Sequence, residues 1–564
     1  MDTKKIVVIG GSAAGPKAAA RARRLAPDAS ITIIQKGSDL SMASCGYPYY
    51  VGKTFDRREE LISTPTGVIR DPKFFANAKG IDALVNTQAT SIDPAARTVT
   101  CRKTDAKETV ELPYDKLIIA TGATPVMPPL PGINLQGVTT LQSMEDADFL
   151  RRAVDENAVK NAVVVGGGLI GVETCEALQE NGVAVTLIEL LPQILGFLDW
   201  EMARIVENHV RAKGVSVITE NGVQAFTGRD GKLQGVTLSD GTECECGLAV
   251  VAVGVRPNTS LAEEAGLRIG ETGGIDVNEY MQTSDENIYA AGDCVQVPDR
   301  ITGKKTLAPY GDLANLQGRV AGENAVLGNR ANFPGTVHTG ICKVFDFSAA
   351  STGLSERKAA DAGMAFDTVI KAGPDVPHFM KGKLLVTKML ADKETGRLLG
   401  VQCVGPGDVS RQTAEAAMAV QGAMTIQDLV TADLPYAPPF SPAIDNLIAT
   451  AHVLENKRNG LFQGVSCAQV KEKADSGQAL FLLDVRGPDE FEAMRLGIGE
   501  KLIPLGALRE RLDELPENKG QEIICYCKVS LRGYEAARLL TGRGWTNVKV
   551  MEGGVMAWPF ERQK

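Results

Sequence analysis

Two cysteines stand out in this sequence as candidates for sulfur chemistry, and Cys45 is the first. It lies in SMASCGYPYY, residues 41–50, among small and flexible neighbours, with no second cysteine close to it. A thiolate is a strong nucleophile, whereas a thiol in such a loop also serves simply as a small apolar side chain. If Cys45 reacts, its sulfur must find a partner outside this loop.

The second candidate is Cys527, in the segment EIICYCKVSLRGYEAARLL. An apolar run typical of a buried strand precedes it, and a helix is expected to begin near Arg532. The amides of the loop CKVSLR could then turn toward the sulfur and, with the helix dipole, stabilise a thiolate or persulfide anion. The alternative is an inert thiol at the end of a buried strand.

The remaining cysteines and histidines predict neither a metal site nor a disulfide framework. The eleven cysteines are scattered and odd in number, and the chain is large. None of the four histidines stands at metal-ligand spacing: His209, His338, His378 and His452. We therefore expect no bound metal and no Cys/His protease.

A glycine loop that is typical of dinucleotide binding lies at the start of the chain. The segment KKIVVIGGSAAGPKAAARARRLAPDASITIIQ predicts a strand, a glycine turn, a helix and a strand. Gly10 permits the turn and Gly15 permits close packing of helix and strand. Ser12 stands at the usual second glycine, and Gln35 stands where an acidic residue usually binds ribose. Glutamine can still accept a hydrogen bond, so we expect a cofactor here rather than a plain turn.

The second glycine loop, in NAVVVGGGLIGVETCEALQENGVAVTLIE, matches the dinucleotide fingerprint fully. Gly166, Gly168 and Gly171 fill the GxGxxG positions, and Glu189 ends the following strand. A carboxylate there accepts hydrogen bonds from ribose hydroxyls but repels a 2′-phosphate. No Arg or Lys follows in LLPQ, so the sequence predicts NADH rather than NADPH.

Two further motifs flank this second loop. KLIIATGATP contains Thr121 and Gly122, and NIYAAGDCVQ contains Gly292 and Asp293. In this order, the motifs resemble the flavin-dependent pyridine nucleotide–disulfide oxidoreductase family, in which an NAD domain is inserted into a split FAD domain. The resemblance covers about residues 1–455, including a dimerisation domain. It implies that Asp293 binds the ribityl chain of FAD and that Thr121 and Gly122 lie at its edge.

The resemblance also gives Cys45 a role. Members of this family that reduce bound disulfides commonly use CxxxxC, but the position five residues before Cys45 is Leu40. LSMASCGYPYYVGKTFDRREELI resembles coenzyme A disulfide reductases and coenzyme A persulfide reductases, whose single cysteine forms a mixed disulfide or persulfide. Electrons would pass from NADH through FAD to the Cys45–sulfur bond. We expect a low Cys45 pKa from a nearby helix start and flavin.

Several other residues are candidates for holding the substrate. Lys17, Arg21 and Arg24 share one face of the first helix, which is either a solvated stripe or, as the resemblance implies, a site for coenzyme A phosphates. Weaker candidates lie around and beyond Cys45: Ser41, Ser44, Arg57 and Arg58. The loop LPYAPPFSPAIDNL resembles a family segment that reaches the partner subunit's site. Its Tyr436 could donate a proton there, or simply pack in the loop.

The end of the chain resembles a second family. ALFLLDVRGPDEFE and EIICYCKVSLRGYEAARLLTGRGWTNVKVMEGGVMAW are similar to rhodanese domains, which carry sulfane sulfur. The resemblance implies that Cys527 holds this sulfur and that Arg532, Asp484 and Arg486 organise its loop. RLGIGEKLIPLGAL lacks the histidine that often precedes the loop in that family, which bears on substrate range.

Length and composition set the frame for these sites. The chain has 564 residues, 44% of them hydrophobic, and a net charge of -9, which argues against a nucleic-acid surface. The first apolar run begins at Ile6 and leaves no room for a signal peptide. No apolar stretch is long enough to span a bilayer, so we expect a cytoplasmic protein without membrane partners.

The predicted fold class is α/β, with Rossmann-like FAD and NAD domains, an α+β dimerisation domain and a rhodanese-like domain. We expect the following boundaries: 1–145 and 266–330 for the FAD domain, 146–265 for the NAD domain, 331–455 for the dimerisation domain and 460–564 for the rhodanese-like domain. The resemblance implies a homodimer.

Four functions remain open at this point. The first hypothesis is an NADH-dependent reductase of coenzyme A persulfide or polysulfide that releases hydrosulfide and thiol, with Cys527 delivering sulfane sulfur to Cys45. The same core could instead reduce coenzyme A disulfide. A third possibility is an NADH oxidase with a cysteine sulfenate. From another class, the chain could be a flavin-containing sulfur-carrier or redox-sensing protein.

Overall fold

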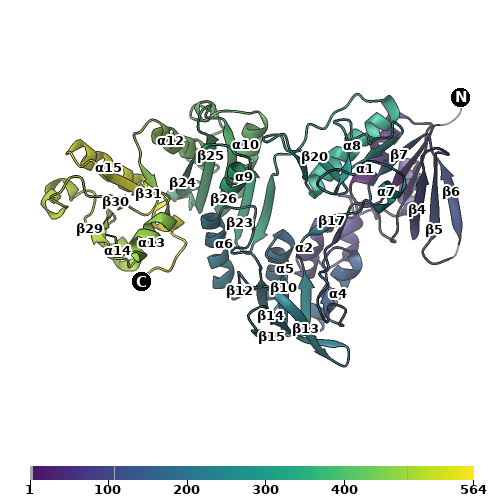
Figure 1. The fold of residues 1–564 in the computed structure, drawn as a ribbon, viewed down its shortest axis with the longest axis horizontal. Helices are drawn as coiled ribbons and strands as arrows, with labels where there is room; N and C mark the ends of the chain where they lie inside the picture. The colour runs from purple at the N-terminus through teal and green to yellow at the C-terminus, as the bar shows by residue number, and fades with distance from the viewer. Residues whose placement is uncertain (1–3, 107, 479, 564) are drawn as a thin grey trace. The chain divides into compact units, whose positions relative to one another are not determined.

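The computed structural model describes residues 4–106, 108–478 and 480–563. Its Cα positions divide into two compact units. The first unit joins Met1–Leu190 to Ile218–Thr336, and the second joins Leu191–Val217 to Val337–Lys564 (Figure 1). Each unit is described by itself below.

A five-stranded parallel sheet forms the centre of the first unit. Its strand order is β19-β7-β1-β2-β3, and all neighbouring strands are parallel. β1, KIVVI, is buried apart from its first residue, as expected for a strand covered on both faces. The strands are β1 (Lys5–Ile9), β2 (Ser30–Ile34), β3 (Asp82–Leu84), β7 (Lys116–Ile119) and β19 (Ile288–Ala290).

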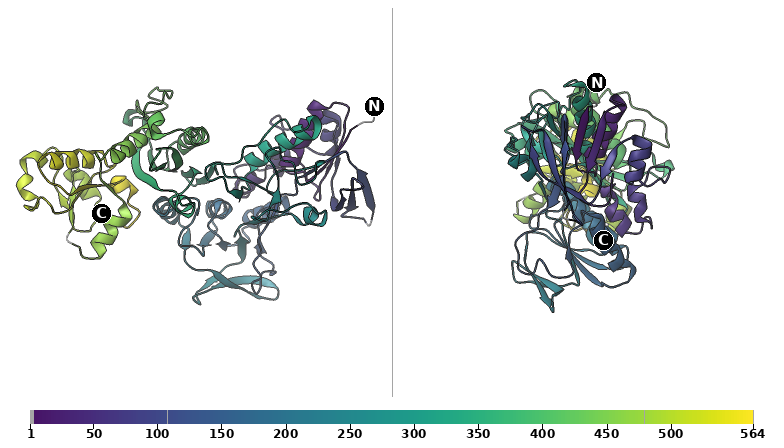
Figure 2. Two further views of the ribbon diagram at one scale, coloured as in Figure 1. Left: turned by 45° about the horizontal axis from the view of Figure 1, so that its top comes forward. Right: turned by 90° about the vertical axis from the view of Figure 1, so that its right-hand side faces the viewer.

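Helices α1 and α8 pack against each other in this unit and lie side by side in purple and teal (Figures 1 and 2). Gly318 and Gly322 allow this approach, since a Cβ at either would stand 2.2–2.3 Å from a carbonyl oxygen of α1. The other helices here are short, apart from α4 and α5. Their bounds are α1 (Ala14–Leu25), α2 (Tyr47–Val51), α3 (Pro72–Lys79), α4 (Met144–Asp155), α5 (Leu169–Gln179), α7 (Ser260–Glu264) and α8 (Gly311–Leu327), with 3₁₀ turns η1 (Ser44–Gly46) and η2 (Arg58–Ile62).

Smaller antiparallel and mixed sheets surround the first sheet. β4, β5 and β6 form one, β8 and β17 a second, and β18, β20 and β21 a third. They carry the chain between the glycine loops and the later motifs. The strands are β4 (Thr87–Asp93), β5 (Thr98–Lys103), β6 (Thr109–Pro113), β8 (Ala123–Pro125), β17 (Val255–Pro257), β18 (Ile275–Asp276), β20 (Val295–Pro298) and β21 (Lys305–Leu307).

A second parallel sheet in the same unit contains the strands β11-β10-β16-β9. Beside it lies an antiparallel sheet of β13, β14 and β15. These strands are β9 (Val138–Thr139), β10 (Asn161–Val165), β11 (Ala184–Ile188), β13 (Val223–Arg229), β14 (Lys232–Leu238), β15 (Glu243–Glu245) and β16 (Leu248–Val251). β12 (Ser216–Ile218) lies where the chain returns to the first unit.

The second unit contains a five-stranded antiparallel sheet, in the order β22-β23-β26-β25-β24. α10 packs on β23 and β26, and α12 on β24 and β25. The strands are β22 (Gly340–Val344), β23 (Phe347–Gly353), β24 (Phe366–Pro374), β25 (Leu384–Asp392) and β26 (Leu398–Gly405). The helices are α6 (Trp200–Ala212), α9 (Glu356–Asp361), α10 (Val409–Gln421), α11 (Ile426–Leu429) and α12 (Asn446–Arg458), with η3 (His378–Met380).

The second unit also contains the C-terminal parallel sheet, drawn in yellow and yellow-green (Figure 1). Its order is β27-β31-β30-β28-β29. The strands are β27 (Gly464–Val465), β28 (Phe481–Asp484), β29 (Lys501–Leu502), β30 (Ile523–Tyr526) and β31 (Val548–Met551). The helices are α13 (Cys467–Asp475), α14 (Pro488–Ala493) and α15 (Leu531–Gly542), with η4 (Leu508–Glu510), η5 (Leu512–Glu514) and η6 (Gly554–Ala557).

The local elements predicted around the two glycine loops are confirmed. β1, α1 and β2 form the first strand–helix–strand unit, and β10, α5 and β11 form the second. α15 begins at Leu531, one residue before the expected position. Within the described residues, no helix is both long and apolar enough to cross a membrane.

Candidate active sites

The first glycine loop connects β1 to α1 as its sequence predicts. Gly10 has a φ of +112°, and a Cβ there would stand 2.0 Å from the carbonyl oxygen of Ala120. A Cβ at Gly15 would stand 1.9 Å from the carbonyl oxygen of Gly10. The Gly11 amide donates to Oε1 of Gln35 at 2.9 Å. Gln35 therefore lies against the loop, although it is not acidic, and Ser12 is half-buried beside it.

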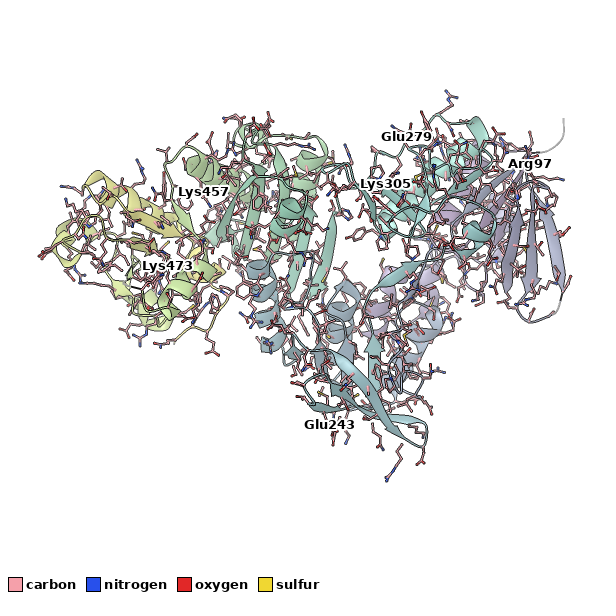
Figure 3. All side chains as sticks on the ribbon, in the orientation of Figure 1. Arg97, Glu243, Glu279, Lys305, Lys457 and Lys473 are labelled. Carbon is pink, nitrogen blue, oxygen red and sulfur yellow. The ribbon has the colours of Figure 1, made fainter. Side chains whose placement is uncertain are left out.

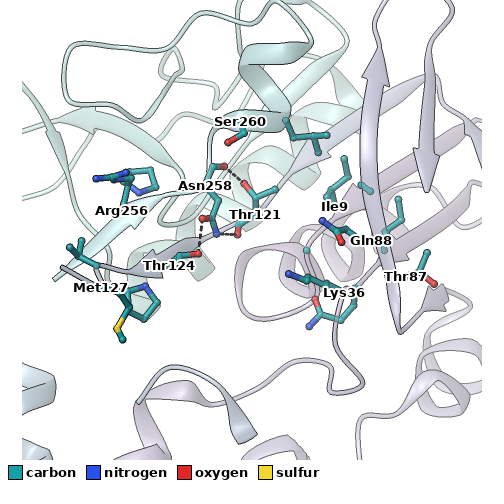
Figure 4. Close-up of a pocket in the computed structure, with 18 residues that line it drawn as sticks. Ile9, Lys36, Thr87, Gln88, Thr121, Thr124, Met127, Arg256, Asn258 and Ser260 are labelled. Atoms are coloured by element: carbon teal, nitrogen blue, oxygen red, sulfur yellow. Dashed lines mark hydrogen bonds between the residues drawn. The ribbon is translucent and has the colours of Figure 1, made fainter. Parts of the chain in front are cut away.

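A cavity of about 550 Å³ opens at the carboxyl ends of β1 and β2 (Figure 4). Thr121 fixes one side, because its Oγ1 donates to the carbonyl of Asn258 at 2.7 Å and its own carbonyl accepts from Asn258 Nδ2 at 2.9 Å. Gly122 has a φ of +68°. The cavity is lined by residues that are far apart in the sequence of the first unit. They include Gly10, Gln35, Lys36, Gln88, Thr121, Arg256, Asn258 and Ser260.

Gly292 and Asp293 follow β19 and lie close to the start of α1. A Cβ at Gly292 would stand 3.2 Å from Cβ of Ala14, and the Gly292 amide donates to Oε1 of Gln317 in α8 at 2.8 Å. Desolvation raises the pKa of Asp293. The fold thus brings the Asp293 motif to the first glycine loop, although the two are far apart in the chain.

The second glycine loop is built like the first. A Cβ at Gly166 would stand 2.4 Å from the carbonyl oxygen of Ala252, and one at Gly171 would stand 1.9 Å from that of Gly166. A Cβ at Gly168 would meet no atom within 4 Å, which leaves the backbone open to a ligand. The Gly167 amide donates to Oε2 of Glu189 at 2.6 Å. Glu189 thus occupies the position that Gln35 has at the first loop.

Cys45 lies in the turn η1 and is exposed. The first residue of α8, Gly311, lies against it: a Cβ there would stand 3.5 Å from the Cys45 Sγ. The N-terminus of α8, a helix of 17 residues, therefore lies close to the sulfur, and the positive end of the helix dipole favours an anion there. The sequence analysis missed Gly311, because only the fold brings α8 to Cys45.

The expected low pKa of Cys45 is wrong for the groups that this chain supplies. Desolvation by the packed protein raises the pKa of the thiol even though the residue has exposed surface, and the carboxylates of Glu173, Asp293 and Asp312 add to the effect. The prediction rested on a nearby helix start and on the flavin. It could not place three carboxylates from separate elements around the same sulfur.

The basic stripe on α1 is only partly free for a ligand. Lys17 and Arg24 are exposed. Arg21 forms an ion pair with Glu323 of α8, with Nε–Oε2 and Nη2–Oε2 distances of 2.9 and 2.5 Å. The expected set of three cations thus reduces to two that project to solvent.

The weaker substrate candidates also differ in their surroundings. Ser44 is exposed and begins η1, whereas the Ser41 carbonyl accepts from Arg70 Nη1 at 3.0 Å. Arg57 is exposed, with Glu59 as a distant ionic partner at 3.7 Å. Arg58 is held between two carboxylates, Asp39 at 2.9 Å and Asp148 at 2.8 Å. Its contacts indicate a structural role.

Tyr436 lies in the irregular segment before α12, in the second unit. Its side chain is 55% exposed, and it has two exposed apolar neighbours in the same segment, Phe440 and Ile444. The side chain is therefore not packed in the core of this chain, and its role as a proton donor stays a prediction.

Cys527 follows β30 and is buried, with 1% of its surface exposed. The loop after it contains Ser530, a non-glycine residue with a φ of +81°, and α15 begins directly afterwards. The Val555 amide donates to the Cys527 carbonyl at 2.9 Å. The predicted strand, loop and helix are confirmed, and the helix N-terminus follows the thiol within the same loop.

An ion-pair network surrounds this loop. Arg486 donates to Asp484 at 2.6–3.0 Å and to the Glu490 carbonyl at 3.0 Å. Glu490 in turn accepts from both Nη atoms of Arg532 at 2.7 and 2.8 Å. The Arg532 hydrogen bonds lower the pKa of Glu490 to about 2. Glu490, in the segment GPDEFE, was not among the predicted site residues.

These features agree with the comparisons to known proteins. Residues 4–306 match the model described as pyridine nucleotide-disulphide oxidoreductase, and residues 339–448 match its dimerisation domain. The chain belongs to the pyridine nucleotide-disulphide oxidoreductase family. Residues 466–560 match the rhodanese-like domain. The predicted fold class is thereby confirmed, and the chain is an oxidoreductase with a C-terminal rhodanese-like domain.

Three relatives illustrate the match. The NAD(P)H coenzyme A polysulfide/persulfide reductase of Pyrococcus horikoshii is 37% identical over 455 residues, which cover 80% of this chain and 98% of that protein. The NAD-dependent persulfide reductase of A. fulgidus has a TM-score of 0.93 at 44% identity and covers 98% and 100% of the two chains. The reduced CoADR-RHD of Bacillus anthracis has a TM-score of 0.91 at 33% identity and covers 99% and 98%.

FAD and a nicotinamide nucleotide are the cofactors of this family, as the sequence predicted. The residues present fit both groups. A cavity at the carboxyl ends of parallel strands, beside a loop where Cβ atoms have no room, is typical of an adenine dinucleotide site. The open backbone at Gly168 beside Glu189 suits the second nucleotide in the same way.

Proposed function

We propose that the protein is an NADH-dependent reductase of coenzyme A persulfide and related polysulfides. One observation carries this proposal: a single exposed cysteine, Cys45, faces the N-terminus of α8 in the unit that holds both glycine loops. With Leu40 at the position of a second thiol, Cys45 must complete its reaction with an external sulfur compound. Two of the three relatives, those of Pyrococcus horikoshii and A. fulgidus, are named for persulfide reduction.

The overall reaction balances in atoms and electrons. The persulfide S–S bond gains two electrons and two protons, which yields coenzyme A thiol and hydrogen sulfide, while NADH is oxidised to NAD⁺. The Cys45 thiolate attacks the carbon-bound sulfur, forms a mixed disulfide and expels hydrosulfide. FAD, when bound, supplies the passage of two electrons from NADH to this disulfide, which releases the coenzyme A thiol and restores Cys45.

The cofactor roles follow from the two loops. We assign FAD to the first loop and its cavity, and NADH to the second loop, where Glu189 favours ribose hydroxyls over a 2′-phosphate. The residues assigned to FAD are Gly10, Ser12, Gly15, Gln35, Thr121, Gly122, Gly292 and Asp293. Those assigned to NADH are Gly166, Gly168, Gly171 and Glu189.

Coenzyme A is proposed to bind along α1 near Cys45. Lys17 and Arg24 would meet its phosphates, since both are exposed, and Ser44 lies beside the sulfur. Arg21 would contribute less to phosphate binding, because it is paired with Glu323. Arg57 and Ser41 remain weaker candidates. Binding of the coenzyme A phosphates would then rest on charges and hydrogen-bond donors of this chain.

The rhodanese-like domain is proposed to supply the sulfur. Its Cys527 thiolate would take a sulfane sulfur from a donor and pass it to coenzyme A thiol or to Cys45. The loop amides and the N-terminus of α15 would stabilise the persulfide anion. Covalent attachment keeps the two sulfur sites at high effective concentration.

The quaternary structure and domain boundaries complete the proposal. We propose a homodimer through residues 331–455, supported by the dimerisation-domain match, with Tyr436 reaching the partner subunit's site as a proton donor. We retain 1–145 and 266–330 as the FAD domain, 146–265 as the NAD domain and 460–564 as the rhodanese-like domain.

Steady-state NADH oxidation with four oxidants tests the function. We expect the highest kcat/KM with coenzyme A persulfide, followed by polysulfide, and the lowest with oxygen. A higher value with coenzyme A disulfide would make the protein a disulfide reductase, and turnover with oxygen alone would make it an NADH oxidase. If none of the four supports turnover, the carrier or sensor hypothesis replaces the proposal.

A further inference from the structure

The sheet of the dimerisation domain ends in an open edge. β24 is the last strand in the order, and it pairs with β25 on one side only. An edge strand presents amide and carbonyl groups that need partners, and proteins cover such groups with side chains or other elements. In this chain, the outward-facing groups at Thr368 and Ile370 have polar side-chain partners.

Two oppositely charged side chains cover this edge. The Ile370 amide donates to Oε2 of Glu552 at 3.0 Å, and Lys457 Nζ donates to the Thr368 carbonyl at 2.7 Å. Lys457 also pairs with Oε1 of Glu552 at 2.7 Å. Together they bind the backbone groups of Thr368 and Ile370 that a neighbouring strand would otherwise bind. Glu552 is only 4% exposed, so this contact is built into the interior.

Glu552 belongs to the rhodanese-like domain, whereas β24 and Lys457 lie outside it. Further contacts join the same parts of the second unit. Asn208 of α6 donates to the Pro559 carbonyl at 2.8 Å, and the rings of Trp200 and Phe560 lie 5.6 Å apart. Glu552 reaches the β24 backbone from the rhodanese-like domain, and Lys457 reaches it from α12.

The turn after Glu552 supports the Cys527 loop. Gly553 and Gly554 have φ values of +72° and +61°, and a Cβ at Gly554 would stand 2.4 Å from the Cys527 carbonyl oxygen. The Val555 amide donates to that carbonyl at 2.9 Å, and the Met556 amide donates to the Lys528 carbonyl at 3.1 Å. A shift of Glu552 would therefore move the backbone on which the thiol loop rests.

We propose that the Glu552–Lys457 pair docks the rhodanese-like domain on the open edge of β24 and thereby positions the Cys527 loop. Glu552 is a positioning residue in this scheme and does not touch the reacting sulfur. The docking holds whether or not Cys527 carries sulfur, while its value for sulfur delivery rests on the proposed function. Glu552 and Lys457 share this role, which the sequence motifs do not reveal.

Hydrogen exchange in the full-length protein tests the docking. The variants are Lys457→Met and Glu552→Gln, with Glu522→Gln as matched control. Glu522 pairs with Lys473 and Lys549 inside the rhodanese-like domain and has no such link to β24, and Lys457 and Lys473 are both labelled in Figure 3. Peptides that contain Ile370 and residues 527–530 are followed by mass spectrometry, together with the alkylation rate of Cys527 by iodoacetamide.

We expect both docking variants to speed exchange at Ile370 and in the Cys527 loop about tenfold, the effect of one charged hydrogen bond. Alkylation of Cys527 should rise with it, while alkylation of Cys45 stays constant. Glu522→Gln should change neither peptide. Lys457→Arg, which keeps the charge, should restore slow exchange. Because no sulfur substrate is present, these results do not depend on the substrate assignment.

Two results would overturn the proposal. One is unchanged exchange at Ile370 and in the Cys527 loop in folded Lys457→Met. The other is faster exchange throughout the rhodanese-like domain, including β28 and β30, which would indicate general destabilisation instead of positioning. If Glu552→Gln fails to fold, Lys457→Met decides alone, because Lys457 lies in α12 outside the domain.

Discussion

The two cysteines proposed to react in this chain lie in contrasting surroundings. Cys45 is exposed in a short turn, faces the N-terminus of α8 and has three carboxylates near enough to raise its pKa. Cys527 is buried at a strand end, and its carbonyl is held by the turn that follows β31. The Arg532 guanidinium interacts with its sulfur.

In the proposed function, this contrast separates two ways of stabilising a reactive sulfur. Desolvation and three carboxylates oppose a Cys45 thiolate, so in the proposed function the N-terminus of α8 and the bound ligands would have to stabilise it. At the Cys527 loop, the Arg532–Glu490 pair is already formed by the chain's own residues. In this scheme, the Cys45 site is completed by bound ligands, whereas the charged groups near Cys527 are already paired in the folded chain.

Cys45→Ser is the strongest test of this division. A hydroxyl cannot form the mixed disulfide, so NADH-dependent reduction of coenzyme A persulfide should fall at least about a thousandfold. Bleaching of the flavin absorbance by NADH should persist, because the two glycine loops are untouched. Equal turnover in the variant, measured as NADH oxidation and sulfide release, would remove Cys45 from the mechanism.

Cys527→Ser should give the opposite pattern. Sulfurtransfer from thiosulfate or persulfide to an acceptor thiol should be lost by at least about a hundredfold, since the sulfur carrier is gone. Reduction of supplied coenzyme A persulfide should remain within about twofold of the parent protein. Loss of both activities would show that sulfur must pass through Cys527, and the two sites would then not be separable.

Glu490→Gln probes the network around Cys527. Losing the charged partner of Arg532 should lower sulfurtransfer about tenfold, while persulfide reduction at Cys45 is unchanged. Glu490→Asp is the conservative control. The pKa of Glu490 is lowered from 4.5 to about 2, so its contribution to stability is present above pH 4.5 and is lost as the pH falls toward 2.

Melting curves against pH check the second part of this prediction. The parent protein should lose stability more steeply than Glu490→Gln between pH 4.5 and 2, because the variant has no carboxylate to protonate. Parallel curves for the two proteins would mean that the Arg532–Glu490 pair does not contribute to the folded state.

Asp312→Asn should have the smallest effect. Removing this negative charge lowers the pKa of Cys45, so alkylation of Cys45 at pH 7 should rise about twofold. Asp312→Glu keeps the charge and should leave the rate near that of the parent protein, and Cys527 serves as an internal reference. A slower rate in Asp312→Asn would show that the carboxylate helps the thiol by another route.

The sequence predicted the features that depend on local order. Gly10, Gly166 and their following helices could be placed because the turn, the close approach and the strand all lie within one short segment. The same holds for the strand, loop and helix around Cys527. The order of the domains along the chain could also be predicted, because each domain carries its own sequence motif.

The features that depend on distant segments could not be predicted. Arg21 appeared free for a ligand, but its partner Glu323 lies 302 residues later. Arg58 is fixed by Asp148, 90 residues away. Gly311 approaches Cys45 only because α8 packs on α1. Single-sequence reading gives residue types along the chain, whereas these pairings follow from tertiary packing.

The covered edge of β24 has a consequence for truncated forms of this protein. A chain shortened before Gly464 would lack Glu552 and would leave the Ile370 amide without its acceptor. Exposed strand edges pair with one another between molecules, so the shortened flavoprotein would have a surface prone to aggregation. The rhodanese-like domain would then also keep the protein soluble. Loss of activity after its deletion could therefore come from aggregation and not from the loss of Cys527.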